Sequence, residues 1–183
     1  KAMNEVLKSN GIKYGIILGG VGILMHLIIY LLGGITEENA ITGGVIQFVF
    51  WLGYLGVRIF QCINTKKDFN NSITFKELFT TLTISITIGI FISQLFTYSL
   101  NNFIDAEYGA EMNEFMNKQQ VIAMKAMKDF TEVSSQDIKE VAKTDNFSII
   151  KTGQAFVMSI LISSIMNLIL AAIFKSKTNP LNE

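Results

Sequence analysis

The chain has 183 residues, half of them hydrophobic, and its formal net charge at neutral pH is zero. Only 16 % of its residues are charged, whereas a soluble domain has about one-quarter. Without a basic excess there is no electrostatic footprint for nucleic acid, so we expect no nucleic-acid partner. The single cysteine, Cys62, excludes a disulfide within the chain.

Four apolar runs are each long enough to cross the hydrocarbon core of a bilayer, which takes about 20 helical residues. The first run is longer than a typical cleavable signal peptide and no A-x-A site follows it, so we read it as a span. The chain begins with Lys1 rather than methionine, and we expect the native start to lie upstream. The sequence therefore predicts an all-α membrane protein with four transmembrane helices, at residues 14–34, 43–63, 78–100 and 152–174.

Basic residues predict the orientation of these spans. The short turn after the first span contains Glu37 and Glu38 and no base. We therefore expect both termini on the cytoplasmic side and residues 101–151 as an extracytoplasmic helical insert. The bases that favour this orientation lie in the two tails and around the second-to-third connection: Lys1, Lys8, Lys13, Arg58, Lys66, Lys67, Lys76, Lys175 and Lys177.

The insert contains apolar residues at three- and four-residue spacing, which predicts one amphipathic helix. The thioethers of the insert's methionines are soft ligands that could bind Cu(I). Methionine is also an adaptable apolar filler, and we expect these side chains to pack. The face could close on a short helix that begins at Ser134, lie on the bilayer or dock a partner. We favour a cap over the outer mouth of the bundle that is available to a partner. The candidate docking face is Met112, Phe115, Met116, Ile122, Met127 and Phe130.

Two helix starts carry the signature of a capping box, in which a hydroxyl residue is followed three positions later by an acid. Thr74 with Glu77 predicts the start of the third span. Ser134 with Asp137 predicts the start of the short second helix of the insert.

The second span has a polar and aromatic stripe formed by Gln47, Trp51, Tyr54 and Arg58. Their spacing of four, three and four residues places them on one helical face. In one interpretation they line a cavity in which Arg58 meets an anionic group such as a lipid phosphate. In the other, Arg58 snorkels to head groups at the cytoplasmic boundary while Trp51 and Tyr54 pack between helices.

His26 is the only histidine and lies within the first span. An ionisable residue inside a membrane is a candidate proton site, metal ligand or haem ligand. We favour a neutral imidazole that is hydrogen-bonded to a neighbouring helix, and keep His26 as a candidate member of the same cavity.

Small and polar residues in the other spans are expected to join helices. Gly15, Gly19 and Gly22 form a small-residue face that could serve close helix approach or a homo-oligomer. The candidate interhelical polar residues are Gln94, Ser163 and Asn167.

The chemistry missing from the sequence limits the function. No acid lies within the predicted spans, so the usual carboxylate of proton-coupled transport is missing, and no span contains proline. The sequence has no phosphate loop, nucleophile elbow or zinc-ligand cluster. We therefore expect no enzymatic activity, no metal and no cofactor.

The segments NSITFKELFTT, at the start of the third span, and SSQDIKEVAK, at the end of the insert, resemble a bacterial membrane family. That family is known as the domain of unknown function number 4199. The resemblance implies a four-span protein of the inner membrane of a Gram-negative bacterium, and implies no site residues.

These observations predict a small accessory or scaffold subunit of a larger envelope complex, with membrane lipids and other membrane proteins as partners. The alternative is a small transporter or lipid-handling protein whose cavity is lined by the second-span stripe. A third interpretation is a cofactor or metal protein using His26 or the methionines.

Overall fold

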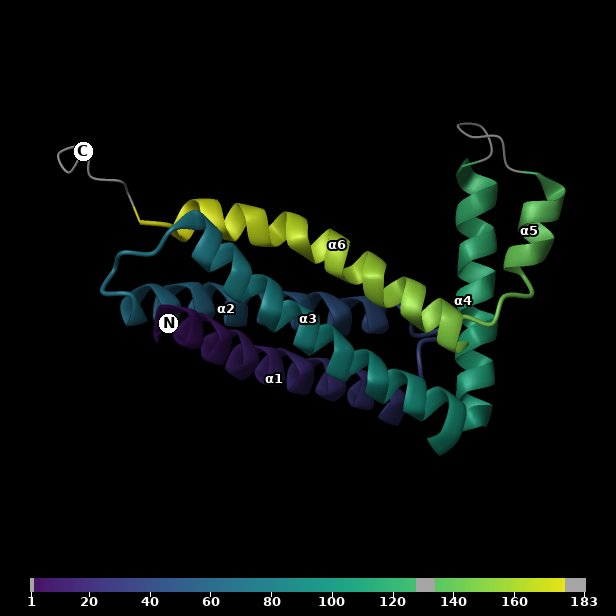
Figure 1. The fold of residues 1–183 in the computed structure, drawn as a ribbon. Helices are drawn as coiled ribbons and strands as arrows, with labels where there is room; N and C mark the ends of the chain where they lie inside the picture. Colours follow the sequence, from purple (N-terminus) through teal and green to yellow (C-terminus); the bar gives the residue numbers. More distant parts are fainter. Residues whose placement is uncertain (1, 128–133, 177–183) are drawn as a thin grey trace.

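The fold is built almost entirely from helices in the part of the chain that the computed structural model describes, residues 2–127 and 134–176 (Figure 1). Four of the helices are long and apolar enough to cross a membrane, and α3 does so together with the π-helix η1 that continues it. This confirms the predicted helical class and the four apolar helices. The elements are α1 (Ala2–Leu31), α2 (Ala40–Asp68), α3 (Phe75–Ser99), η1 (Leu100–Ile104), α4 (Ala106–Met127), α5 (Ser135–Val141) and α6 (Ile149–Phe174).

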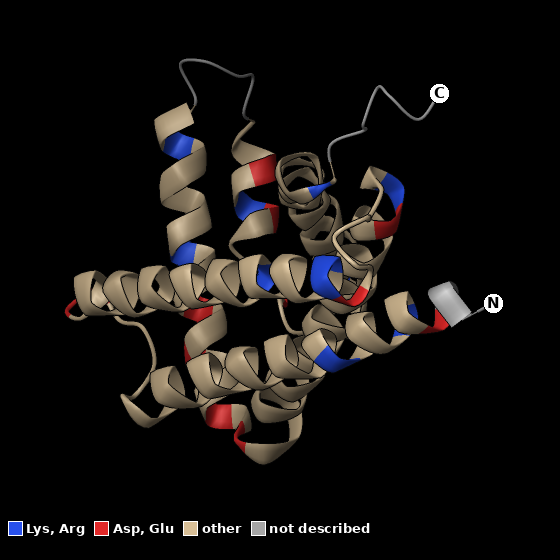
Figure 2. Ribbon diagram, turned by 90° about the vertical axis from the view of Figure 1, so that its left-hand side faces the viewer, with Lys and Arg blue, Asp and Glu red and all other residues tan. Residues whose placement is uncertain are grey.

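The helices extend beyond the apolar runs, because a helix can continue into water after it leaves the hydrocarbon. α2, for example, continues through Lys66 and Lys67 to Asp68. Figure 2 shows long uncharged stretches along the spanning helices, with most charged residues near helix ends or on α4 and α5. Both predicted capping boxes are present, at Thr74 with Glu77 and at Ser134 with Asp137. Hydrogen bonds from Ser134 hold the pKa of Asp137 below its usual value.

A glycine face on α1 sets the distance between α1 and α3, which run parallel and side by side. A Cβ added at Gly15 would lie 2.7 Å from Ile88 and 3.0 Å from the Ser85 carbonyl oxygen. One turn away in each direction, Gly11 meets Ile84 and Gly19 meets Ile92 in the same register. Small residues let helix backbones approach closely in a membrane, where packing replaces the hydrophobic effect as the attractive force. The small-residue face therefore joins two helices of one chain.

Polar side chains and an apolar cluster close the end of the bundle that contains the start of α1 and the end of α6. Gln61 of α2 donates to the Thr81 carbonyl (3.2 Å) and accepts from the Ser85 hydroxyl (2.9 Å). The backbone N–H of Ser176 donates to the Ile73 carbonyl at 2.9 Å. The buried core at this end contains residues of α1, α2, α3, α6 and the α2–α3 connection: Leu7, Cys62, Phe69, Ile73, Leu78, Leu82, Leu170 and Ala171.

At the opposite end, α4 crosses the bundle at a steep angle to the four long helices (Figure 1). Asp105 holds this corner, since one carboxylate oxygen accepts from the Tyr30 hydroxyl and the other from the Tyr108 backbone N–H, each at 3.0 Å. The rings of Tyr30 and Tyr108 meet edge to face with centroids 4.9 Å apart. Burial, with Tyr30 and Asp105 nearby, raises the pKa of Tyr108. Gly109 lies so close to η1 that a Cβ there would overlap the Asn101 backbone.

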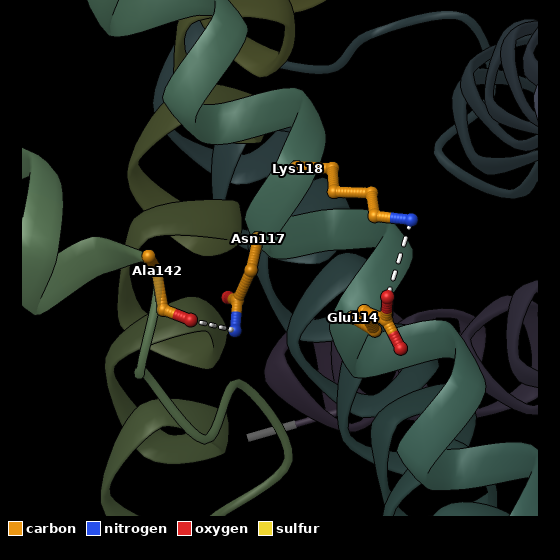
Figure 3. A network of polar contacts seen from close by, with 4 residues as sticks. All are labelled: Glu114, Asn117, Lys118 and Ala142. Carbon is orange, nitrogen blue, oxygen red and sulfur yellow. Dashed lines mark hydrogen bonds and ion pairs between the residues drawn. The ribbon is translucent and has the colours of Figure 1, made fainter.

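Three asparagines tie α4 to the segment that leads back into α6. Asn146 donates to the side-chain oxygens of Asn113 (2.8 Å) and Asn117 (2.6 Å). Asn117 in turn donates to the carbonyls of Thr144 (2.9 Å) and Ala142 (3.3 Å), the second of which Figure 3 shows. The nearby Glu114–Lys118 pair, also in Figure 3, is solvent-exposed and joins residues one turn apart at 3.1 Å. Exposed pairs contribute little, so the amide network holds the segment.

Replacing Gly15 with leucine should loosen the contact between α1 and α3. The added side chain would overlap Ile88, and we expect the free energy of unfolding to fall by about 1–3 kcal/mol or more. Circular dichroism of the purified protein during thermal unfolding in detergent measures the loss. Gly20→Leu is the matched control, because nothing lies within 4 Å of a Cβ at Gly20. Equal stability of the two variants would contradict the packing described.

Gly109→Ala should lift the start of α4 from the bundle end, because the new methyl group would overlap the Asn101 backbone. We expect amide hydrogen exchange in α4 to accelerate by about tenfold, as a loss of roughly 1.4 kcal/mol in local stability implies. Gly153→Ala is the control, since a Cβ at Gly153 meets nothing within 4 Å. Unchanged exchange in the Gly109 variant would show that α4 is held by other contacts.

Candidate functional site

A cavity of about 1060 Å³ is lined by residues of α2, α3 and α6, together with Met25 and His26 of α1. Its lining on α6 runs from Thr152 to Ile169, about 25 Å at the rise of an α-helix. α2 and α6 share the apolar core at the closed end and line opposite sides of the cavity beyond it. Met116, Asn146 and Phe147 line it near α4. We call this space the wedge.

The structure brings the predicted stripe and the histidine to this one cavity. Gln47, Trp51, Tyr54, Arg58 and His26 all line the wedge. Trp51 is 51 % exposed, whereas the Tyr54 hydroxyl turns inward and donates to the Leu18 carbonyl of α1 at 2.7 Å. The stripe therefore forms much of the α2 wall of the wedge.

Arg58 is buried within the bundle and is the last residue of α2 that lines the wedge, at the end next to the apolar core, which we call the narrow end. Arg58 is only 7 % exposed. It lies about 15 Å along α2 from Asp68, at 1.5 Å per residue. Its Nη2 donates to the Ser163 carbonyl at 3.1 Å and to the Asn167 side-chain oxygen. The interpretation in which Arg58 snorkels to head groups is therefore wrong: the guanidinium turns toward α6 instead of the boundary.

All the hydrogen-bond partners of the guanidinium that the structure describes are neutral. Its Nε is buried and has no hydrogen-bond partner. No aspartate or glutamate is among the residues that line the wedge. Removing a charged group from water costs several kcal/mol unless an opposite charge and further hydrogen bonds compensate. Arg58 is thus a buried cation with spare hydrogen-bonding capacity and, among the residues that the structure describes, no counter-ion.

His26 makes a local contact. Its Nδ1 is 2.8 Å from the Gly22 carbonyl oxygen one turn earlier, where an Nδ1–H would donate. The expected hydrogen bond to a neighbouring helix is therefore replaced by one within α1. Among the described residues no three His, Cys, Asp or Glu side chains gather into a possible metal site.

The three predicted interhelical polar residues differ in what they do. Asn167 is buried, accepts from Arg58 and has its Nδ2 3.5 Å from the Thr83 hydroxyl of α3, so it joins three helices. Ser163 meets Arg58 through its backbone carbonyl. Gln94 lines the wedge, and its side-chain oxygen is buried without a hydrogen-bond partner.

The predicted docking face on α4 is divided among several surroundings. Met112 contacts the turn after α1, because a Cβ at Gly34 would lie 2.7 Å from its methyl carbon. Met116 lines the mouth of the wedge, and Phe115 is half-buried. Ile122 is 58 % exposed and Met127 is 53 % exposed. Phe130 lies outside the described residues, and α4 is described only to Met127.

Sequence reasoning missed the asparagine network and two members of the glycine contact. Asn113 and Asn117 are one turn apart on α4, a spacing that could have marked them as a shared polar face. Gly11 continues the four-residue spacing of Gly15 and Gly19 toward the start of α1. Gly89 approaches Leu18 from α3, but a lone glycine carries no such pattern.

Stability measurements should show that Arg58 is not retained for folding. In Arg58→Met a flexible apolar side chain replaces the buried charge, and we expect stability within about 1 kcal/mol of the parent or higher. Asn167→Leu leaves the charge and removes an acceptor, and should destabilise by about 1–3 kcal/mol. Thermal unfolding in detergent compares the two. A larger loss in Arg58→Met than in Asn167→Leu would make Arg58 a structural residue.

Comparison with curated proteins and with solved structures gives no match. A family model with the description "Protein of unknown function (DUF4199)" matches residues 13–176, from α1 to the end of α6. This range contains the wedge and all the candidate residues placed by the structure. The chain therefore belongs to the DUF4199 family, as the resemblance of its third-span start and its insert predicted.

Proposed function

We propose that this protein binds a lipid or another amphiphile in the wedge, as a small lipid-handling protein of the bacterial inner membrane. The observation that supports this is a single cavity that joins Arg58, the rest of the second-span stripe and His26. The geometry thus favours the lipid-handling alternative over an accessory role.

The size and lining of the wedge suit an amphiphile. Ligand sites are typically about 300–1,000 Å³, mostly apolar, with few polar groups, and the wedge is about 1060 Å³. Phe48, Ile90 and Ile162 are among the apolar side chains that would contact a hydrocarbon chain. Phe48 and Ile162 are 59 % and 64 % exposed, so a chain could pass between the wedge and surrounding lipid.

The orientation belongs to the same proposal. With Lys8, Lys13, Lys66 and Lys67 on the cytoplasmic side, the closed end of the wedge faces the cytoplasm and α4 lies on the periplasmic side.

A scaffold or accessory role is a second candidate. The later half of α4 and the short α5 project past the bundle in Figure 1, and Ile122 is exposed there. Such a surface suits another envelope protein, which would make the protein a non-catalytic subunit; a homo-oligomer would use the same surface. Native purification of an Ile122→Glu variant tests this role, because it should lose partners that the parent retains.

Filling the wedge should abolish amphiphile binding. In the double variant Ala155→Trp, Ser159→Trp, both indoles would project from one face of α6 into the lining. We expect native mass spectrometry from mild detergent to show about tenfold less bound lipid, equivalent to about 1.4 kcal/mol of affinity. The matched control is Val157→Trp, Leu161→Trp, at exposed positions outside the lining. Equal lipid retention in both double variants would count against the proposal.

A further inference from the structure

We infer that the head group bound in the wedge is an oxyanion, a phosphate or a carboxylate on an apolar chain, and that Arg58 binds it at the narrow end. This inference rests on the proposed amphiphile binding and adds the chemistry and the position of the head group.

The first support is the unused donor of Arg58. A guanidinium has five N–H donors in a planar fork that matches the oxygens of carboxylate and phosphate. Nη2 is occupied by the Ser163 carbonyl and by Asn167. Nε is buried without a partner. Nη1 makes no hydrogen bond among the contacts that the structure describes, and Arg58 lines the cavity, so an oxyanion in the wedge would supply an acceptor for the guanidinium.

The second support is charge. The acids of known position near the two ends of the bundle are engaged elsewhere or lie outside the wedge. Asp68 accepts from Asn10 at 2.8 Å, Glu77 caps α3, and Asp105 accepts from Tyr30. None lines the wedge. An anionic ligand would therefore be the counter-ion of Arg58.

A neutral head group fits less well. A hydroxyl or amide could accept a hydrogen bond from the guanidinium, but the positive charge would stay uncompensated in the bundle. An oxyanion adds a Coulomb attraction to the guanidinium that an alcohol lacks, and this attraction grows where water is excluded. The site should therefore select an oxyanion over an alcohol with the same chain.

The position of Arg58 fixes the pose. The apolar core closes the bundle beyond it, so the head group lies at the narrow end and the chain extends back along the stripe. Trp51 lies about two turns earlier on the same face of α2 and also lines the wedge. It is the only tryptophan in the chain, so its fluorescence reports on a bound chain.

The test uses the full-length protein in detergent with three bromine-labelled probes of equal chain length: an alkyl phosphate, an alkyl carboxylate and an alkyl alcohol. Bromine near Trp51 quenches its fluorescence. We expect saturable quenching by at least one anionic probe at a concentration about tenfold lower than for the alcohol. Tighter binding of the phosphate points to a phospholipid-like source, and tighter binding of the carboxylate to a fatty acid.

Variants then assign the preference to Arg58. Asn167→Asp would place a carboxylate beside the guanidinium as an internal counter-ion, and Arg58→Gln removes the charge. Both should lose about tenfold in affinity for the anionic probe and keep the affinity for the alcohol. Lys67→Gln removes a charge from the same helix outside the wedge, and should change neither.

The probes and variants distinguish a failure of the head-group inference from a failure of amphiphile binding. If all three probes quench equally in the parent, or if the anionic preference survives in Asn167→Asp and Arg58→Gln, the head-group inference is overturned while amphiphile binding stands. If no probe quenches Trp51 saturably, amphiphile binding in the wedge is itself overturned.

Discussion

The close contact between α1 and α3 is the constraint on which the rest of the bundle depends. Because glycines on α1 face isoleucines on α3 in register, the two helices form one closely packed pair. α2 and α6 pack against this pair. The polar contacts of α2 with this pair, through Tyr54 and Gln61, are made along its length. α2 and α6 share the apolar core only at the end near Cys62 and Leu170. The wedge is the space left where they separate.

Arg58 occupies the point at which α2 and α6 begin to separate. Two neutral oxygens of α6 satisfy one of its nitrogens, and no carboxylate lines the space around it. A bundle selected for stability alone would gain by placing an apolar side chain here, since buried charges are commonly replaced without loss. A residue that breaks this rule inside an otherwise consistent core is a mark of function. A bound oxyanion would explain why a charged residue is kept at this position.

The insert is attached through polar contacts that its amphipathic pattern does not reveal. Asp105 connects the end of α1 to the start of α4, and the asparagines fasten the returning chain to the side of α4. Together they hold Met116 and Phe147 at the mouth of the wedge. The mouth is thereby defined by residues from α4 and from the segment before α6, which are distant in the sequence.

The sequence by itself determined the features that depend on a single stretch of chain. Hydropathy identified the four apolar helices, and the capping boxes at Thr74 and Ser134 identified two helix starts, because hydrophobic runs and caps are local properties. Helical spacing also placed Gln47, Trp51, Tyr54 and Arg58 on one face. Only the tertiary structure decided what each face meets. It turned Arg58 inward to α6, directed His26 to its own helix, paired the glycines with α3 and built the asparagine network. These outcomes depend on which helices converge and at what angle, and that is set by packing between segments far apart in the chain.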